Sequence, residues 1–323
     1  MSSPPRIVFY GTPDFAVASL DAICGAGYRV VAVVTAPDRP AGRGLKERPP
    51  AVKSAAVRLG LPVLQPVNLK DPAFAEQLES FGPDLQVVIA FRMMPRSVWD
   101  LPPMGTINLH ASLLPQYRGA APINHAIING ERQTGVTTFF INDRIDTGAV
   151  LLSERLEIGP DETAGELHDR LMVAGAALVL KTIALIAEGQ ANPVGQDSLT
   201  LPAASLKTAP KIFPADCRIK WEQDVARVHN FIRGLSPHPG AYTELVMADG
   251  SVRALKIFRS TPLHDLPDAL PGKVFTDGKE LLAIAAAGGW LRISELQMEG
   301  RKALSSADFL RGYGRILSET RAI

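Results

Sequence analysis

The sequence predicts an α/β protein in which a mostly parallel, Rossmann-like sheet domain precedes a smaller barrel of short strands. Residues 6–36 read as strand, helix and strand, the pattern of a parallel βαβ unit. After residue 211, short apolar strands alternate with turn residues, which is typical of a small β-barrel. Gly and Pro are frequent between the two regions, as in linkers. We therefore expect a first domain at 1–189, a linker at 190–210 and a second domain at 211–323.

Hydrophobic periodicity assigns the elements of the first domain. Residues 6–10 form an apolar run, as in a strand buried on both faces, and the helix after them ends at Gly25. Thr163 and Glu166 have the spacing of a capping box, so a long helix should begin there and continue to residue 188. Further strands are expected at 28–36, 62–65, 84–90, 105–110, 135–142 and 149–154, and helices at 51–59 and 71–81.

The turn after the first strand tests whether this sheet binds a dinucleotide. The glycine fingerprint of such sites is Gly-x-Gly-x-x-Gly, whereas this turn reads Gly-Thr-Pro-Asp-Phe-Ala. Pro13 lacks the backbone N–H that a phosphate needs, and Asp14 places a negative charge at the start of the helix. The sequence therefore predicts a Rossmann-like sheet without its phosphate site, which disfavours a nicotinamide-dependent oxidoreductase.

The second domain is predicted to be mainly β. Residues 211–323 carry 16 Lys and Arg against 13 Asp and Glu, while the whole chain has a net charge of +1. This mild basic excess is weak support for a polyanionic partner, and on charge alone a solvated surface is the favoured explanation. Strands are expected at 217–221, 241–246, 252–258, 273–275, 281–285 and 290–296, with a helix at 224–235.

Cysteine usage and hydropathy indicate a cytoplasmic protein. Cys24 and Cys217 fall in different predicted domains, which excludes a disulfide framework and a cysteine-based metal site and fits a reducing compartment. The N-terminus lacks a signal-peptide pattern, and no apolar run is expected to approach the ~18 residues that span a membrane. We expect a monomer without a membrane partner.

Polar residues are concentrated in 105–124, read as G-T-I-N-L-H-A-S-L-L-P-Q-Y-R-G-A-A-P-I-N. Asn108 and His110 alternate with apolar neighbours, so they should project from one face of a strand. Gly119 then permits close approach of the backbone, and Pro122 suits the first turn of a helix. Ligands of open α/β sheets bind where strands end and helices begin, so we expect the functional site here.

This block, with I-D-T-G at 145–148, resembles the formyltransferases that use 10-formyltetrahydrofolate. The segments I-V-F-Y-G-T-P-D-F-A and V-V-T-A-P-D-R-P-A-G-R-G narrow the resemblance to members that formylate initiator methionyl-tRNA. The resemblance covers nearly the whole chain and weakens after residue 215. It implies an OB-like barrel for 211–323 that contacts tRNA, 10-formyltetrahydrofolate as the co-substrate, and no metal.

The resemblance also implies roles for individual residues. Taken singly, each residue has a purely structural explanation: Asn108 as an amide that caps backbone groups, His110 as a hydrogen-bonded core histidine, and Asp146 as a turn former. Together, amide and imidazole N–H groups can stabilise the oxyanion of formyl transfer, and a carboxylate can accept the amine proton. The implied catalytic residues are Asn108, His110 and Asp146, and the implied folate-binding residues are Ser112, Leu113, Leu114 and Pro115.

Residues 37–53 form a Pro- and Gly-rich loop with five positive charges. Such a loop can bind a phosphate backbone, or it can be an ordinary solvated surface. The resemblance favours the first reading and implies tRNA contacts by Arg39, Arg43, Lys46 and Arg48. The alternatives left open are formylation of a small amine, hydrolysis of the same folate, and RNA binding without catalysis. The loop after 84–90 departs from the family pattern, with Phe91 and Arg92 in place of Tyr and Gly.

Overall fold

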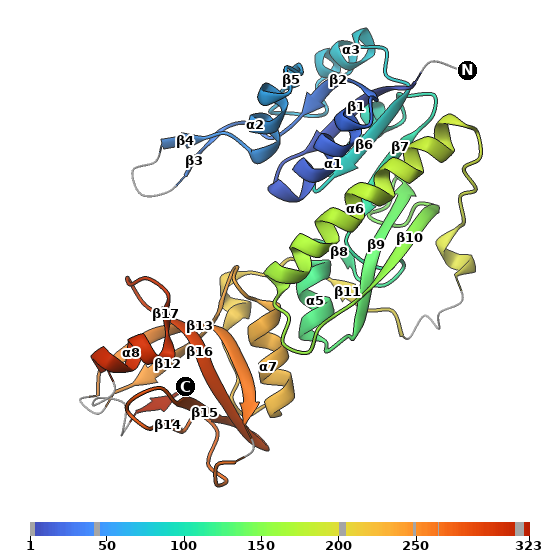
Figure 1. Ribbon diagram of the computed structural model, residues 1–323. Helices are drawn as coiled ribbons and strands as arrows, with labels where there is room; N and C mark the ends of the chain where they lie inside the picture. Colours follow the sequence, from blue (N-terminus) through green and yellow to red (C-terminus); the bar gives the residue numbers. More distant parts are fainter. Residues whose placement is uncertain (1–3, 42–45, 200–204, 248–249, 264, 314–319) are drawn as a thin grey trace. The chain divides into compact units, whose positions relative to one another are not determined.

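The computed structural model describes residues 4–41, 46–199, 205–247, 250–263, 265–313 and 320–323 (Figure 1). The chain divides into two compact units. The first unit comprises Met1–Gly119, Thr134–Leu156 and His168–Thr208. The second comprises Ala120–Gln133, Glu157–Leu167 and Ala209–Ile323.

A seven-stranded sheet organises the first unit, with the strand order β10-β9-β7-β6-β1-β2-β5. Neighbouring strands from β7 to β5 pair in parallel, whereas β7 and β9 are antiparallel. The predicted Rossmann-like fold class is therefore confirmed. The strands are β1 (Arg6–Gly11), β2 (Arg29–Val34), β5 (Val63–Leu64), β6 (Leu85–Ile89), β7 (Thr106–His110), β9 (Gln133–Phe140) and β10 (Val150–Glu157).

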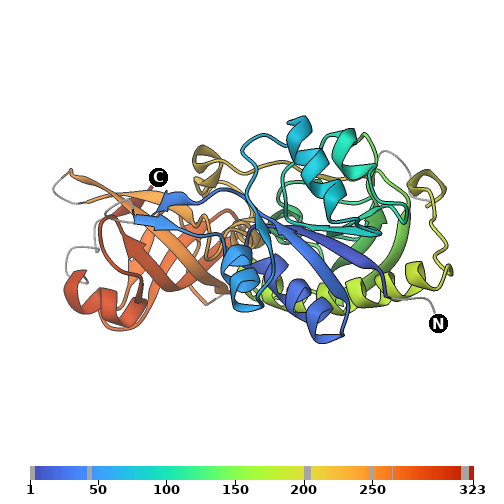
Figure 2. The same ribbon diagram turned by 90° about the horizontal axis from the view of Figure 1, so that it is seen from above.

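Helices cover both faces of this sheet. Figure 2 shows blue α1 (Asp14–Gly25) and yellow-green α6 (Ala164–Ala187) along one face and cyan α3 (Pro72–Ser80) along the other. Val8, Tyr10 and Val88 alternate toward the α3 face, where Phe74 and Leu78 complete an apolar core. The remaining short elements are β3 (Arg39–Ala41), β4 (Lys46–Arg48), α2 (Ala51–Arg58), α4 (Arg96–Trp99), β8 (Arg118–Gly119), η1 (Gln196–Ser198) and β11 (Thr208–Ala209).

Helix α6 corrects one expectation. By length and composition it is apolar enough to cross a membrane, since an 18-residue window has a mean hydropathy of 1.9. The expectation that no such stretch exists was therefore wrong. A core helix passes the same test, and α6 has the contacts of one: the Thr182 hydroxyl lies 2.7 Å from that of Thr138, and Gly175 faces Leu109 of β7. Its residues Leu171, Val179 and Ile183 are fully buried.

The second unit is built on an antiparallel sheet with the order β14-β15-β16-β13-β12-β18. A bridge between Lys273 and Arg321 joins the two ends of this order and nearly closes it into a barrel, as predicted for an OB-like domain. The strands are β12 (Ala241–Val246), β13 (Val252–Leu263), β14 (Val274–Thr276), β15 (Leu282–Ala286), β16 (Gly289–Met298), β17 (Leu304–Ser305) and β18 (Arg321–Ala322). The helices are α5 (Pro122–Ile128), η3 (Pro214–Cys217), α7 (Val225–Gly234) and α8 (Ser306–Tyr313).

The strand expected at 217–221 does not form. Residues 214–217 form a short 3-10 helix in which the Asp216 carboxylate accepts the N–H of Phe213. Within 217–221, one isolated bridge joins Arg218 to Tyr242. The apolar residues that suggested a strand are nevertheless buried, because Cys217, Ile219 and Trp221 pack into the barrel core. Burial without a continuous ladder explains the error.

Candidate active site

Strand β7 presents the first two predicted catalytic residues. Asn108 pairs in register with Val88 on one side and Phe139 on the other, and its side chain is half-buried. Leu109 points to α6, so Asn108 and His110 project from the opposite face. The structure thus places this pair on one face, as the alternation predicted.

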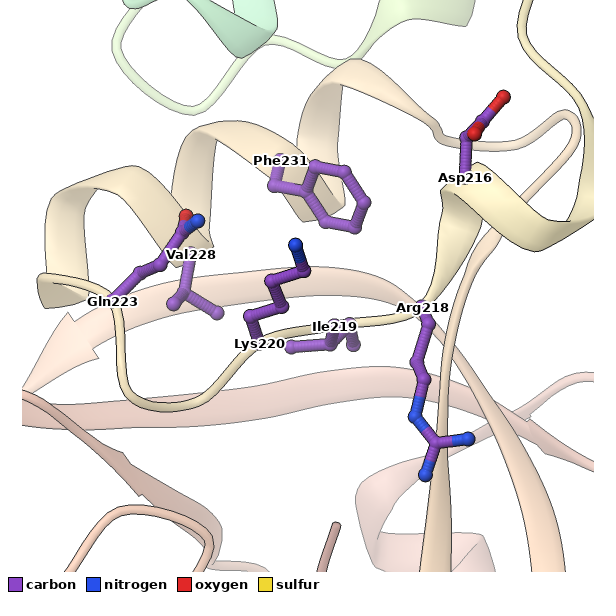
Figure 3. A pocket seen from close by; sticks show the side chains of 7 residues that line it. All are labelled: Asp216, Arg218, Ile219, Lys220, Gln223, Val228 and Phe231. Atoms are coloured by element: carbon purple, nitrogen blue, oxygen red, sulfur yellow. The ribbon is translucent and has the colours of Figure 1, made fainter.

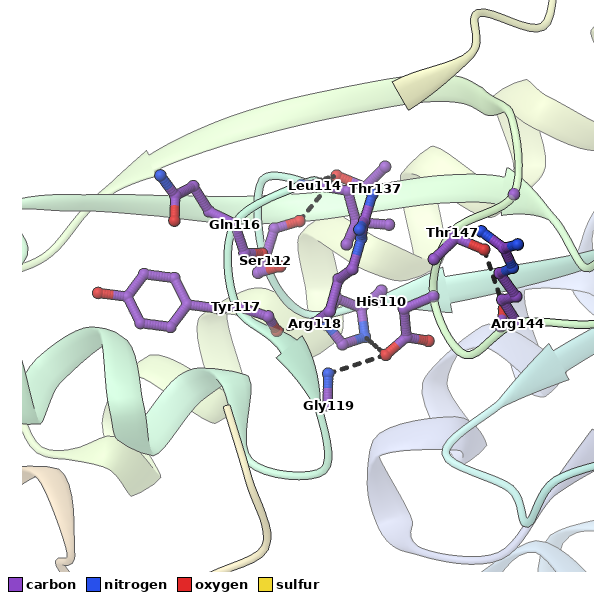
Figure 4. A network of polar contacts seen from close by, with 12 residues as sticks. His110, Ser112, Leu114, Gln116, Tyr117, Arg118, Gly119, Thr137, Arg144 and Thr147 are labelled. Carbon is purple, nitrogen blue, oxygen red and sulfur yellow. Dashed lines mark hydrogen bonds and ion pairs between the residues drawn. The ribbon is translucent and has the colours of Figure 1, made fainter. Parts of the chain in front are cut away.

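The His110 ring lies between two acceptors (Figure 4). Its Nε2 is 2.9 Å from the backbone carbonyl oxygen of Tyr117, and its Nδ1 is 3.8 Å from Oδ2 of Asp146. A carbonyl oxygen can only accept, so Nε2 carries a proton and Nδ1 is the nitrogen that faces the carboxylate. The side chains are 8% and 14% exposed, and this burial strengthens their electrostatic interaction.

Backbone geometry, rather than sequence proximity, brings Asp146 to this position. Its Oδ2 accepts the N–H of Gly119 at 2.9 Å, across 27 residues of chain. Gly148 makes the turn possible, because a Cβ there would lie 1.6 Å from the carbonyl oxygen of Phe140. The glycine of the I-D-T-G motif is thus required by the close approach of two backbone segments.

Three non-glycine residues of the described chain have positive φ, and two of them contact the His110 ring. Ala90 (φ 47°) directly follows β6, Tyr117 (φ 58°) supplies the carbonyl that binds His110, and Asp146 (φ 54°) carries the carboxylate. Each such conformation costs on the order of 1–3 kcal/mol and persists only where surrounding contacts fix it. Backbone strain of this kind is concentrated at functional sites.

The predicted folate residues form a tight turn after β7. The Ser112 hydroxyl donates to the carbonyl oxygen of Gln116, and the Thr137 hydroxyl donates to the carbonyl of Ser112. Leu114 is buried against β9 and β10, and Pro115 is buried as well. Leu113, which is half-buried, is the member of the four best placed to meet a ligand.

The predicted tRNA loop contains a hairpin. Strands β3 and β4 pair antiparallel, with Arg39 opposite Arg48, and both arginine side chains are exposed. Lys46 is described by its backbone only, and Arg43 lies outside the described residues. The remaining lysine of the loop does not project freely, because Lys53 forms an ion pair with Asp38, which lowers the pKa of that carboxyl.

The loop after β6 adds a further cation. Phe91 packs edge-on against Tyr10 at 5.5 Å between ring centroids, and the Arg92 guanidinium lies over the Phe91 ring. Arg92 donates to the backbone carbonyls of Pro66 and Val67. Burial lowers the pKa of Arg92, and the Arg39 guanidinium lowers it further. The residues that depart from the family pattern therefore extend the positive field around Arg39.

No group of three or more metal-ligating side chains occurs in the part of the chain that the structure describes. The second unit has a separate pocket of about 140 Å³ (Figure 3). The ammonium of Lys220 points toward the Phe231 ring, and the Arg218 guanidinium is paired with Glu244 at 2.8 Å. The pocket is lined by Asp216, Arg218, Ile219, Lys220, Gln223, Val228 and Phe231.

Comparison with known families agrees with this architecture. The formyl transferase model matches residues 5–183, and the model of the formyl transferase C-terminal domain matches residues 211–314. The chain belongs to the formyl transferase family. The resemblance seen in the sequence is therefore confirmed.

Relatives from curated proteins match this family member almost end to end. A methionyl-tRNA formyltransferase of Parabacteroides distasonis is 49% identical over 98% of both chains. One from Porphyromonas gingivalis is 49% identical over 95% of both.

Solved structures share the fold at lower identity. HypX from Aquifex aeolicus in complex with tetrahydrofolic acid has a TM-score of 0.64 and 21% identity, covering 98% of this chain. This chain spans about half of that protein, 48% of its length. An N-formyltransferase from Helicobacter canadensis, in complex with folinic acid and dTDP-3-aminofucose, has a TM-score of 0.64 and 20% identity over 90% of this chain and 98% of that one.

Sequence reasoning missed the residues that hold the site together. Arg118 and Gln196 hydrogen-bond to each other, and Gln196 also binds the backbone of the Asp146 turn. Gln196 falls in the segment that was assigned to a linker. The available signal was a polar residue within a Gly- and Pro-rich segment, and this pattern is too common to single out Gln196.

Proposed function

We propose that this protein transfers the formyl group of 10-formyltetrahydrofolate to the amino group of initiator methionyl-tRNA. The observation that carries the proposal is its near end-to-end similarity, at 47–49% identity, to relatives that bear the name methionyl-tRNA formyltransferase. The buried His110–Asp146 pair on a strained backbone supports it independently, because a purely structural turn has no need of such an arrangement. We expect the protein to act in the cytoplasm, as a monomer.

The chemistry requires an oxyanion stabiliser and a proton acceptor. The amine attacks the formyl carbon, a carbon–nitrogen bond forms, and a tetrahedral oxyanion develops before the bond to the folate nitrogen breaks. We assign the side-chain amide of Asn108 as donor to the oxyanion, since the structure gives this half-buried group a position beside His110. Loss of such a donor typically lowers the rate ~10²–10³-fold.

The proton path runs through Asp146 and His110. Asp146 accepts the amine proton, directly or through a water that it holds, while its Oδ2 stays anchored by Gly119. Because Nε2 of His110 is engaged by Tyr117, Nδ1 is the ring nitrogen that exchanges a proton with the carboxylate. The proton is then delivered to the departing folate nitrogen. This assignment moves the expected role of His110 from simple oxyanion donor to proton carrier.

Substrate contacts are assigned from exposure. Half-buried Leu113 contributes an apolar wall to the folate, and buried Ser112, Leu114 and Pro115 hold the turn in shape. The exposed arginines of the β3–β4 hairpin contact tRNA phosphates. In the second unit, Lys220 and Phe231 combine a cation with an aromatic face, which suits a nucleotide of the same tRNA.

One assay tests the proposal. The protein is incubated with 10-formyltetrahydrofolate and charged initiator tRNA, and the amino acid released from the tRNA is analysed for formylmethionine. We expect formylmethionine with the wild type and none with His110→Ala. Formylation of a small amine such as an amino sugar nucleotide, with charged tRNA left unmodified, would assign the protein to another branch of its family.

A further inference from the structure

The amide of Gln196 has every hydrogen-bonding position occupied. This residue opens η1 and is 5% exposed. Its Oε1 accepts from Nε and Nη2 of Arg118, at 3.0 and 2.5 Å. Its Nε2 donates to the backbone carbonyls of Asp146 and Gly148, both at 2.9 Å. A guanidinium can only donate and a carbonyl can only accept, so one orientation of the amide satisfies all four contacts.

These contacts join the two segments that hold His110. Arg118 lies between Tyr117, whose carbonyl binds Nε2 of His110, and Gly119, whose N–H binds Asp146. Asp146 itself faces Nδ1 of the same ring. The Gln196 amide therefore connects the segment that fixes one side of the imidazole to the turn that fixes the other.

The Asp146 turn needs an external support. Its positive φ of 54° is unfavourable for a residue with a side chain. The carboxylate's own bond to Gly119 holds the side chain, whereas the bonds from Gln196 hold the backbone on both sides of Thr147. Without them, the turn can relax to a commoner conformation and carry the carboxylate away from His110.

We propose that Gln196 is a positioning residue for the formyl transfer, acting through the backbone of the Asp146 turn. The inference rests on the proposed function. It also explains why an amide is needed: a carboxylate would repel the two carbonyls, and a cation would repel Arg118. Gln196 touches no reacting atom, and its effect is exerted on the distance between Asp146 and His110.

The test is Gln196→Glu, which has the same shape and keeps the Arg118 contact. Since small displacements of a catalytic group cost up to ~10²-fold in rate, we expect kcat for methionyl-tRNA to fall ~10- to 100-fold with little change in either KM. The matched control is Gln116→Glu. Its amide joins the neighbouring loop to Ser205 and Lys207 but does not contact the Asp146 turn, so its kcat should match the wild type.

A double-variant cycle separates positioning from general stability. In an Asp146→Ala background, Gln196→Glu should lower the residual single-turnover rate by less than about twofold, because its target is already gone. A further large loss there would overturn the proposal, as would a wild-type kcat in Gln196→Glu. If the charged variant fails to fold, Gln196→Met, which is similar in size and lacks the polar contacts, replaces it with the same expectations.

A crystal structure of the variant distinguishes this proposal from the proposed function. We expect Oδ2 of Asp146 to leave hydrogen-bond distance of the Gly119 nitrogen. An unmoved carboxylate would refute the positioning role even if the enzyme formylates tRNA. If the carboxylate is displaced but the protein formylates no tRNA, the positioning role stands and the proposed function is refuted.

Discussion

Asp146 owes its position to neighbours that are distant in sequence. Its anchors are Gly119, 27 residues away, and Gln196, 50 residues away. Neither contact follows from a local pattern, which is why the sequence could suggest a turn at I-D-T-G but not the direction of the carboxylate. Period-two alternation, in contrast, was enough to place Asn108 and His110 on one face of β7.

Replacing the carboxylate tests its role as proton acceptor. We expect Asp146→Ala to lower kcat ~10²–10⁴-fold, the usual contribution of a general base. The thermal unfolding midpoint should change by only a few degrees, since one hydrogen bond is lost. Asp143→Ala is the control, because Asp143 is an exposed carboxylate of the same loop. Equal turnover in the Asp146 and Asp143 variants would contradict the assignment.

Among the elements, the connection from β9 to β10 depends on one glycine. A Cβ on Gly148 would overlap the backbone of Phe140, which cannot move without breaking β9. The predicted strands on either side are present, but no local sequence pattern indicates this contact. The contact arises because the end of β9 and the residues just before β10 approach each other closely where the two strands begin to pair.

Gly148→Ala should therefore displace the turn. We expect kcat to fall at least ~10-fold and the unfolding free energy to drop by about 1–3 kcal/mol, as for other strained or overpacked sites. Gly25→Ala is the control, because a Cβ there meets nothing within 4 Å and its φ is not positive. Steady-state kinetics and urea unfolding of both variants provide the measurement. Full activity in Gly148→Ala would show that the turn can adapt.

The start of α6 shows which contacts a local motif predicts and which it does not. The capping box is confirmed, since Thr163 N–H donates to Glu166 at 2.8 Å and the Thr163 hydroxyl accepts from Glu166 N–H at 3.3 Å. The sequence could not show that Glu166 also pairs with Arg259 on β13. This long-range pair, with the Thr163 bonds, lowers the pKa of Glu166 from 4.5 to about 2.

That lowered pKa predicts an acid-dependent contribution to stability. A carboxyl whose pKa is lower in the folded than in the unfolded state stabilises the fold at pH values above its unfolded pKa of 4.5. This contribution is lost as the pH falls toward about 2. Both side chains are nearly half exposed, so screening limits it to roughly 1 kcal/mol or less. Glu166→Gln should be destabilised at pH 7, and its difference from wild type should shrink between pH 4.5 and 2. Urea midpoints measure this, with exposed Glu222→Gln as the control; a constant difference would contradict it.

At the scale of the whole molecule, fold class was more predictable than the details of either unit. Apolar runs and turn spacing indicated the parallel sheet and the near-closed barrel, because burial and strand period repeat over many residues. The hairpin at 39–48 was not foreseen, since its composition of Pro, Gly and charged residues is that of a loop. The ion pair between Lys53 and Asp38 was not predicted either, because the two residues lie 15 positions apart in the chain.

The last prediction concerns the β3–β4 hairpin, whose arginines we expect to contribute to tRNA affinity and not to the chemical step. Arg39 and Arg48 are exposed and adjacent across β3 and β4, so each can neutralise a phosphate. Replacing both by Ala should raise KM for tRNA, leave KM for folate unchanged, and reduce the slope of log KM against log salt by roughly one per lost contact. Arg58→Ala is the control, because Arg58 is exposed but paired with Asp21. A salt slope equal to that of wild type would mean that these arginines do not touch the phosphate backbone, whereas an equal rise in the folate KM would place the hairpin beside the folate instead.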